Sequence, residues 1–451
     1  MKNSEELRQQ LRSINRKSYP AYKGLKGLYH FGNYILSIDH VQGDPFASPS
    51  HVSIQISHRD TGFPVEYYKD TLTGTTLCDY LTRQFEKQVS QYSFRAKGSG
   101  KSGLLTASHC GQEILSRTAC EITEKGITAR FFVGFPANGR TINATELEKI
   151  LFDFLPVCIQ KSFFYSSLNA KELQNYIELA EDQEFIRQTL PAKNLCAFIA
   201  DGSILPRESG ISSRPMKASI PFTSPDSLRI SINLPHKGKI TGMGIPKGIT
   251  LIVGGGYHGK STLLNALELG VYNHIPGDGR EYVITDATAV KLRSEDGRFI
   301  KDVDISMFIN DLPNKKDTRC FSTLDASGST SQAAGIVESM EAGSHLFLLD
   351  EDTSATNFMV RDAFMQQVIQ REKEPITPFL ERAEDLYKKQ GFLQFLLPVV
   401  PGHSFILQIQ LSRWTITFQK ILQLLSKNYA ANILCLLFQL LIFSFRTAIA
   451  L

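Results

Sequence analysis

The chain has 451 residues, of which 42% are hydrophobic and 21% are charged. These values fit a globular protein with two or three domains and exclude a largely disordered chain. The net charge of +4 is too small to predict a nucleic-acid or membrane-surface protein by itself. The charged N-terminus has no signal-peptide core and the seven cysteines form no CxxC pair, so we expect a cytoplasmic protein without a zinc site, and membrane association is not expected.

The first half of the chain mixes strand-like and helical segments. Alternation predicts strands at 51–57, 126–135 and the start of 194–216, and apolar spacing predicts helices at 143–163 and 170–190. Asn143 or Thr145 is the expected cap of the first helix, and Pro191 is expected to end the second. A Gly-, Ser- and Pro-rich connection then predicts the end of a mixed α+β N-terminal domain, residues 1–216.

From residue 217 strands and helices alternate. The predicted strands are "SLRISINL", "GITLIV", "EYVITD" and "HLFLLDED", and the predicted helices are "STLLNALELGV" and "STSQAAGIVESMEAG". This alternation predicts an α/β domain, residues 217–391, with a mostly parallel sheet covered by helices.

The stretch "GGGYHGKST" between a predicted strand and a predicted helix has the pattern GxxxxGK[ST]. Its glycines let backbone N–H groups approach phosphate oxygens, and the helix presents its positive end to the anion. Lys260 is expected to reach the β and γ phosphates of ATP, and Ser261 to bind Mg²⁺. The residues of this predicted site are Gly254, Gly255, Gly256, Tyr257, His258, Gly259, Lys260, Ser261 and Thr262. The alternative is a chance match in a glycine-rich turn.

Two further segments carry candidate site residues. "HLFLLDED" places Asp350 and Glu351 at the carboxyl end of a buried strand, where Asp350 fits a magnesium ligand and Glu351 a general base. An acid cluster that caps a helix is the alternative. "ASGSTSQ" opens a helix with Ser327, Gly328 and Ser329, which predicts a second anion-binding N-terminus or, alternatively, an ordinary helix cap.

A third segment, "RAKGSGKSG" at 95–103, contains Gly-Lys-Ser but has Arg95 where the phosphate-loop pattern needs its first glycine. We interpret it as a basic, glycine-rich loop and not as a second nucleotide site.

Together these elements resemble an ABC-type ATPase, with "SGSTSQ" in the place of the signature loop and "LLDEDTSATN" in the place of the Walker B motif and D-loop. Longer blocks, among them "FIADGSILPRESG", "DISMFINDLP" and "FSTLDASGSTSQAA", resemble the soluble family of predicted ATPases of the ABC class over about residues 1–391. The resemblance implies a P-loop NTPase fold, catalysis by Lys260 and Glu351, and a head-to-tail homodimer that encloses ATP and Mg²⁺. It also implies RNA as a partner. The chain departs from other ABC proteins at Asp352 and Asn357, where Pro and Asp are usual, and no convincing Q-loop glutamine is found.

Three functions follow as hypotheses. The first is a cytoplasmic ATPase that acts on a macromolecule, with RNA contacted by the basic stretches 8–26 and 95–103. Ordinary solvated surface charge is the alternative for these stretches. The second is the ATP-binding subunit of a membrane transporter. The third is a scaffold that binds ATP with little hydrolysis.

The segment 392–451 differs from the rest of the chain. No Asp or Glu follows Asp385, although 451 − 385 = 66 residues remain, and "NILCLLFQLLIFSF" is strongly apolar. Three interpretations stand: a shifted reading frame after Gly391, which would impair hydrolysis, a native buried tail, or a membrane anchor. The apolar run is shorter than the roughly 20 residues that span a bilayer.

Overall fold

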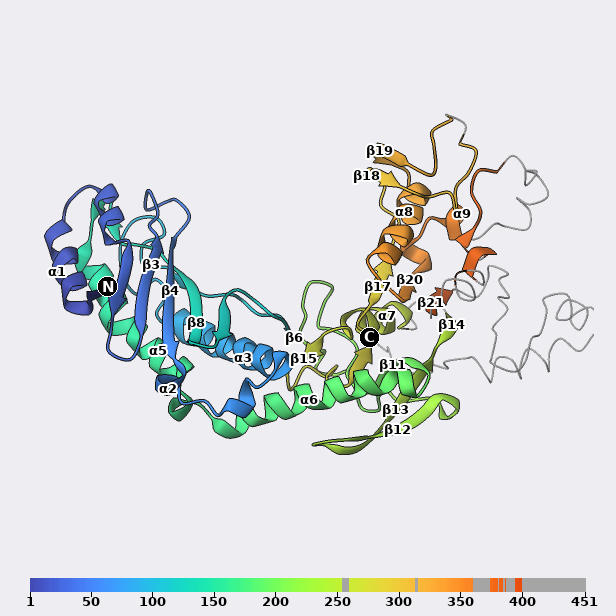
Figure 1. The fold of residues 1–451 in the computed structure, drawn as a ribbon, viewed down its shortest axis with the longest axis horizontal. Helices are drawn as coiled ribbons and strands as arrows, with labels where there is room; N and C mark the ends of the chain where they lie inside the picture. The colour runs from blue at the N-terminus through green and yellow to red at the C-terminus, as the bar shows by residue number, and fades with distance from the viewer. Residues whose placement is uncertain are drawn as a thin grey trace, which may run out of the picture. The chain divides into compact units, whose positions relative to one another are not determined.

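The computed structural model describes residues 1–253, 259–312, 315–359, 374–379, 381–383, 386 and 394–399 (Figure 1). The chain forms two compact units. The boundary between them falls between Glu181 and Asp182, inside helix α6 (Ala170–Ala192). Unit 1 holds the residues up to Glu181 and a short return at His274–Pro276, and unit 2 holds the rest. The domain boundary proposed at residue 216 stays a prediction. No helix in the described part of the chain is long and apolar enough to cross a membrane.

Unit 1 is built on one sheet with the strand order β1-β2-β3-β4-β8-β5, and β7 also pairs with β8. The strands are β1 (Lys2–Asn3), β2 (Gly27–His30), β3 (Ile35–His40), β4 (Ser50–Ser57), β5 (Leu105–Thr106), β7 (Cys120–Thr123) and β8 (Gly126–Val133). Strands β4 and β8 confirm the predicted strands and pair antiparallel along their whole length. Because their side chains alternate between the two faces, every second residue enters the core.

Helices cover the inner face of this sheet (Figure 1). They are α1 (Ser4–Ile14), α3 (Thr71–Ser90), α4 (Ala144–Glu148) and α5 (Leu155–Phe163). The fully buried Phe85 of α3 joins them to the sheet, because its ring contacts Phe131 of β8 and Phe163 of α5.

The two helices predicted in the first half of the chain are present, but the first has a π-helical interruption and the second extends beyond Pro191. Asn143 is the cap of the first, and its side chain accepts the Glu146 N–H at 3.3 Å. This helix runs as α4, a π-helical stretch and α5, because Pro156 has no N–H to donate to the preceding turn. Pro191 does not end α6, which continues to Ala192, since a proline in the last turn removes only one helical hydrogen bond.

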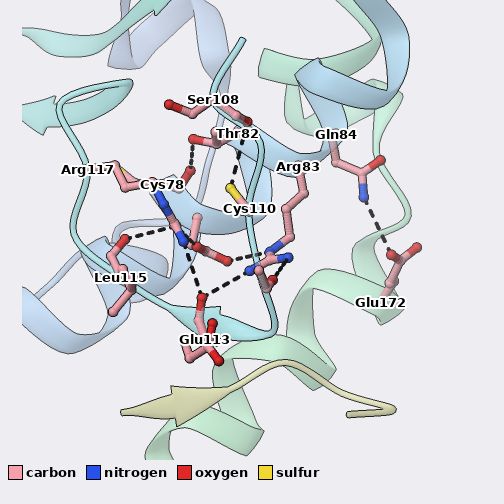
Figure 2. A network of polar contacts seen from close by, with 12 residues as sticks. Cys78, Thr82, Arg83, Gln84, Ser108, Cys110, Glu113, Leu115, Arg117 and Glu172 are labelled. Atoms are coloured by element: carbon pink, nitrogen blue, oxygen red, sulfur yellow. Dashed lines mark hydrogen bonds and ion pairs between the residues drawn. The ribbon is translucent and has the colours of Figure 1, made fainter. Parts of the chain in front are cut away.

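A buried carboxylate holds the irregular segment 107–119 against α3 (Figure 2). Asp79 has a fully buried side chain and pairs with Arg83 at 2.6 Å and with Arg117. The two guanidinium groups also donate to backbone carbonyls of the segment, including that of Glu113. Each cation therefore fixes the segment's backbone as well as the buried charge.

Unit 2 contains two separate four-stranded sheets. One is antiparallel with the order β12-β13-β11-β16, and the other is parallel with the order β14-β21-β20-β17. Their strands are β11 (Leu195–Ala200), β12 (Arg229–Leu234), β13 (Gly238–Pro246), β16 (Val283–Thr285), β14 (Gly248–Val253), β17 (Ala289–Leu292), β20 (Leu346–Leu349) and β21 (Gln394–Val399). "SLRISINL" and "EYVITD" thus belong to the antiparallel sheet, which corrects the expectation of one mostly parallel sheet. The reason is the short turn between β12 and β13, which reverses the chain as a hairpin.

Helices α7 (Lys260–Leu269) and α8 (Gly328–Glu341) cover opposite faces of the parallel sheet. Strand β20 is buried on both faces: Leu346 and Leu348 pack with α7, whereas Phe347 and Leu349 pack with α8. A hairpin of β18 (Arg298–Val303) and β19 (Phe321–Ala326) leads directly into α8.

Strand β21 lies between β14 and β20 and is parallel to both. Residues 394–399 therefore form the strand that joins β14 to β20 in the parallel sheet. The reading-frame interpretation stays a prediction, and residues 400–451 lie outside the described part of the chain.

We predict that Asp79→Ala lowers the free energy of unfolding of unit 1 by about 3–5 kcal/mol, because it leaves two part-buried guanidinium groups without their anion. Urea denaturation followed by circular dichroism measures this. The control is Glu121→Ala, which breaks the solvent-exposed pair with Arg130 and is expected to change stability by about 1 kcal/mol or less. Equal effects of the two substitutions would contradict this account.

Candidate functional site

The described part of the phosphate loop has the geometry that its sequence predicts. Gly259 has φ 77°, a left-handed conformation that favours glycine, and it caps the N-terminus of α7. Lys260, Ser261 and Thr262 form the first helical turn, with Ser261 exposed and the other two part-buried. The first-turn N–H groups of a helix have no helical acceptor, so this turn offers donors and a positive dipole end to an anion.

Asp350 follows β20 directly and is 6% exposed. Burial raises its pKa, the neighbouring Asp352 raises it further, and Lys291 and Lys260 partly oppose the shift. The charged form of this carboxylate is thus destabilised in the free protein. A cation at this point would reverse that cost.

The parallel register brings these two features to one edge of the sheet. Strands β14 and β20 both run toward this edge, and only β21 separates them. At the usual strand spacing the ends of β14 and β20 lie about 10 Å apart, which leaves room for a phosphate group and a cation.

Lys291 joins β17 to the phosphate-loop helix near this edge. Its ammonium group lies 3.0 Å from the Glu268 carboxylate and donates to Asn265 Oδ1 at 2.8 Å, both on α7. The sequence analysis missed Lys291. The sequence signal that could have identified Lys291 is its place near the end of a short strand, β17, that precedes the Ser327–Ser329 segment.

Two segments remote in the sequence, residues 204–207 and 278–280, contact each other next to α7. Arg280 donates to the Leu205 carbonyl and, at 3.5 Å, to the Asn265 carbonyl of α7. Arg207 makes a two-pronged contact with buried Asp278, to its side chain and to its carbonyl, both at 2.8 Å. These contacts tie residues 204–207 and 278–280 to the helix that carries Lys260.

The signature residues begin α8. Ser327 is its N-cap, and its hydroxyl accepts the Thr330 N–H at 3.4 Å. A Cβ on Gly328 would come within 3.0–3.1 Å of Ser294 and Asp296, so the loop 293–297 closes over this position. Ser329 is buried. The cap is therefore present, and the role of these three residues in binding ATP stays a prediction.

Several predicted site residues lie outside the described part of the chain. These are Gly254, Gly255, Gly256, Tyr257 and His258. The backbone of Glu351 begins a 3₁₀ turn, Glu351–Thr353, directly after Asp350. The prediction that Glu351 acts as a general base rests on this place directly after Asp350.

The described residues fit ATP and Mg²⁺. Gly259 has open space where a Cβ would stand, the first turn of α7 supplies N–H donors and Lys260, and the buried Asp350 is destabilised as an anion. Ser261 and Asp350 offer the oxygen ligands that Mg²⁺ prefers. Among the described residues no cluster of three or more His, Cys, Asp or Glu side chains could hold a metal alone.

The parallel strand order, the glycine-capped helix and the buried aspartate together define a P-loop protein. Family comparison extends this assignment. The model of an ABC ATPase P-loop domain matches residues 169–410, and the model of the N-terminal region of ATPases of the ABC class matches residues 4–166. The chain belongs to this family of ABC-class ATPases. It is also 35% identical over 190 residues to an uncharacterized protein of Methanocaldococcus jannaschii, a match that covers 40% of this chain and 42% of that protein.

We predict that Asp350→Asn stabilises the nucleotide-free protein at neutral pH, because it removes a buried carboxylate whose charged form is destabilised. The same change is expected to remove most of the stabilisation by Mg-ATP, which is about 2.7 kcal/mol at a ligand concentration 100 times Kd. Thermal unfolding with and without Mg-ATP measures both effects.

The control for this experiment is Asp352→Asn, the same substitution at an exposed position two residues further on. It is expected to retain the stabilisation by Mg-ATP. A wild-type response to Mg-ATP from Asp350→Asn would contradict the assigned role.

Proposed function

We propose that this protein is an ATPase that binds ATP and Mg²⁺ at the edge of the parallel sheet and hydrolyses ATP in a head-to-tail homodimer coupled to RNA binding. The observation that carries the proposal is the placement of the α7 N-terminus and the buried Asp350 at the ends of two strands separated only by β21. Ser261 and Asp350 would hold Mg²⁺, which would supply charge neutralisation at the phosphates.

Each residue has a separate task in this proposal. The α7 N–H groups and Lys260 bind and orient the phosphates, and the fixed helix position limits their reorganisation. Glu351 accepts a proton from the attacking water. The Ser327–Ser329 loop of one protomer completes the site of its partner and excludes water from it.

The RNA part of the proposal rests on a surface of unit 1 that joins the two predicted basic stretches. The 95–103 loop is fastened to neighbouring loops by Ser99 N–H to Ala137 O at 2.7 Å and Lys101 N–H to Pro45 O at 2.8 Å. Ala137 belongs to a short hairpin of β9 (Ala137–Asn138) and β10 (Thr141–Ile142). The first basic stretch reaches the same hairpin through Arg16 N–H to Ile142 O at 3.1 Å. Backbone contacts thus bring the two basic stretches, which lie far apart in the sequence, to the same hairpin.

Two exposed aromatic rings flank the basic loop. Phe46 is 62% exposed and Phe94 is 52% exposed. Phe94 has φ 60°, a strained conformation for a bulky residue, and its N–H donates to Gly103 O at 2.7 Å. The Asp44 carboxylate accepts the Phe46 N–H and pairs with Arg140; these contacts lower its pKa. Arg140 is thereby neutralised.

Exposed rings beside basic side chains are typical of surfaces that bind single-stranded nucleic acid, where bases stack on the rings and cations meet phosphates. The cations we assign to this surface, which we name the basic aromatic face, are Arg16, Lys17, Arg95, Lys97 and Lys101, with the rings Phe46 and Phe94.

We predict that Lys260→Ala abolishes ATP binding, whereas Glu351→Gln binds ATP, lowers turnover by about 100-fold or more and accumulates as an ATP-bound dimer. Turnover assays and sedimentation velocity at saturating Mg-ATP measure these effects. Binding of ATP without turnover by the wild-type protein would favour the scaffold hypothesis. A wild-type and Glu351→Gln protein that both remain monomeric with ATP would contradict the dimer.

For the basic aromatic face, we predict that Lys97→Gln with Lys101→Gln weakens binding of single-stranded RNA and reduces the salt slope of the affinity by about 1.4, since each phosphate contact on a single strand contributes about 0.7. Fluorescence anisotropy at several salt concentrations measures this. The control is Lys161→Gln with Lys171→Gln, which removes the same charge from exposed positions on α5 and α6. Equal losses in both variants would show only an effect of net charge.

A further inference from the structure

A buried glutamine on the signature helix binds the segment that follows Asp350. Gln332 lies in the second turn of α8 and is fully buried. Its side-chain oxygen accepts the Ala355 N–H at 2.9 Å, and its side-chain nitrogen donates to Ser354 Oγ at 3.0 Å. The same nitrogen lies 3.6 Å from Met359 Sδ. Both ends of one amide group are therefore used on residues 354–359.

The loop 293–297 makes a second connection between the same two elements. Its Ser294 N–H donates to Thr353 O at 2.9 Å, and its Glu295 N–H donates to Ser331 Oγ at 2.8 Å. Ser331 is buried, and its hydroxyl in turn donates to the Gly328 carbonyl at 2.8 Å. The first turn of α8 and the residues after Asp350 are thus joined from two sides.

These contacts make independent movement of the two elements costly. A shift of residues 353–355 relative to α8 would leave buried donors and acceptors of Gln332 and Ser331 without partners. Each such group costs about 1–3 kcal/mol when it is left unsatisfied. A displacement at the end of β20 therefore moves the first turn of α8 with it.

We propose that Gln332 is a positioning residue that couples the nucleotide state at Asp350 and Glu351 to the Ser327–Ser329 loop of the same protomer. The inference rests on the proposed function, in which that loop contacts ATP held by the partner. One protomer's nucleotide then sets the position of the loop that completes the other protomer's site. Gln332 supplies a link inside the protomer, in a chain that has Asp352 and Asn357 where other ABC proteins have Pro and Asp.

The test uses Gln332→Met in the full-length chain, because methionine keeps the length of the side chain and removes both hydrogen bonds. We expect its affinity for ATP to stay within about threefold of wild type, since α7 and Asp350 are intact. We expect ATP-dependent dimerisation to weaken by about tenfold, within the usual range of coupling between sites, and the Hill coefficient of turnover to fall toward 1. Nucleotide titration, sedimentation velocity and steady-state kinetics measure the three quantities.

A second measurement reports the coupling directly. Amide hydrogen exchange is followed in residues 326–334 and 350–359 with and without Mg-ATP, in Glu351→Gln and in Glu351→Gln with Gln332→Met. We expect ATP to change exchange in both segments of the first protein and only in residues 350–359 of the second. Ser354→Ala, which removes one partner of Gln332, is expected to weaken the coupling in part. Ser339→Ala is the control on the same helix, because its hydroxyl donates within α8, to Gly335 O at 2.7 Å.

The outcomes separate this inference from the function on which it rests. Cooperative, ATP-dependent dimerisation in the wild type that persists in Gln332→Met would overturn the coupling role and leave the ATPase proposal intact. Absence of ATP-dependent dimers in the wild type would overturn both. If Gln332→Met does not fold, as judged by its thermal transition, unaltered cooperativity in Ser354→Ala overturns the coupling role, and reduced cooperativity supports it.

Discussion

The parallel pairing of β14, β21 and β20 is the constraint on which the site depends. Parallel strands direct their carboxyl ends to one edge, so the glycine-capped α7 and Asp350 meet there although 90 residues separate Lys260 from Asp350 (350 − 260). Burial of β20 between α7 and α8 then fixes the depth of the aspartate. An exposed strand would leave that carboxylate solvated and without a raised pKa.

Groups of opposite charge lie at this edge of the parallel sheet. A helix N-terminus, Lys260 and Lys291 form the positive side, and a buried carboxylate with Asp352 behind it forms the negative side. The desolvated Asp350 carboxylate keeps a raised pKa although both lysines oppose the shift. A triphosphate with its cation complements both sides at once, and this is the physical reason that the family's nucleotide chemistry suits this fold.

Elements that are defined by residues close together in the sequence could be predicted from the sequence. Alternation identified β4 and β8, the apolar run "LFLL" identified β20, and the GxxxxGK[ST] pattern identified the α7 N-terminus. Errors arose over the direction in which neighbouring strands run. β12 and β16 read as members of a parallel sheet, yet they pair with β13 and β11 in an antiparallel one. Strand patterning reports burial and does not report the direction of the neighbour.

The sequence by itself therefore determined the class of protein and the candidate phosphate, magnesium and base residues, because those depend on residue types at short, fixed spacings. Only the tertiary structure decided the contacts of Gln332, the meeting of Lys291 with α7, and the backbone contacts of two basic stretches with one hairpin of unit 1. Each of these depends on distances between segments remote in the chain. Such distances are set by the packing of complete sheets and helices and leave no local pattern.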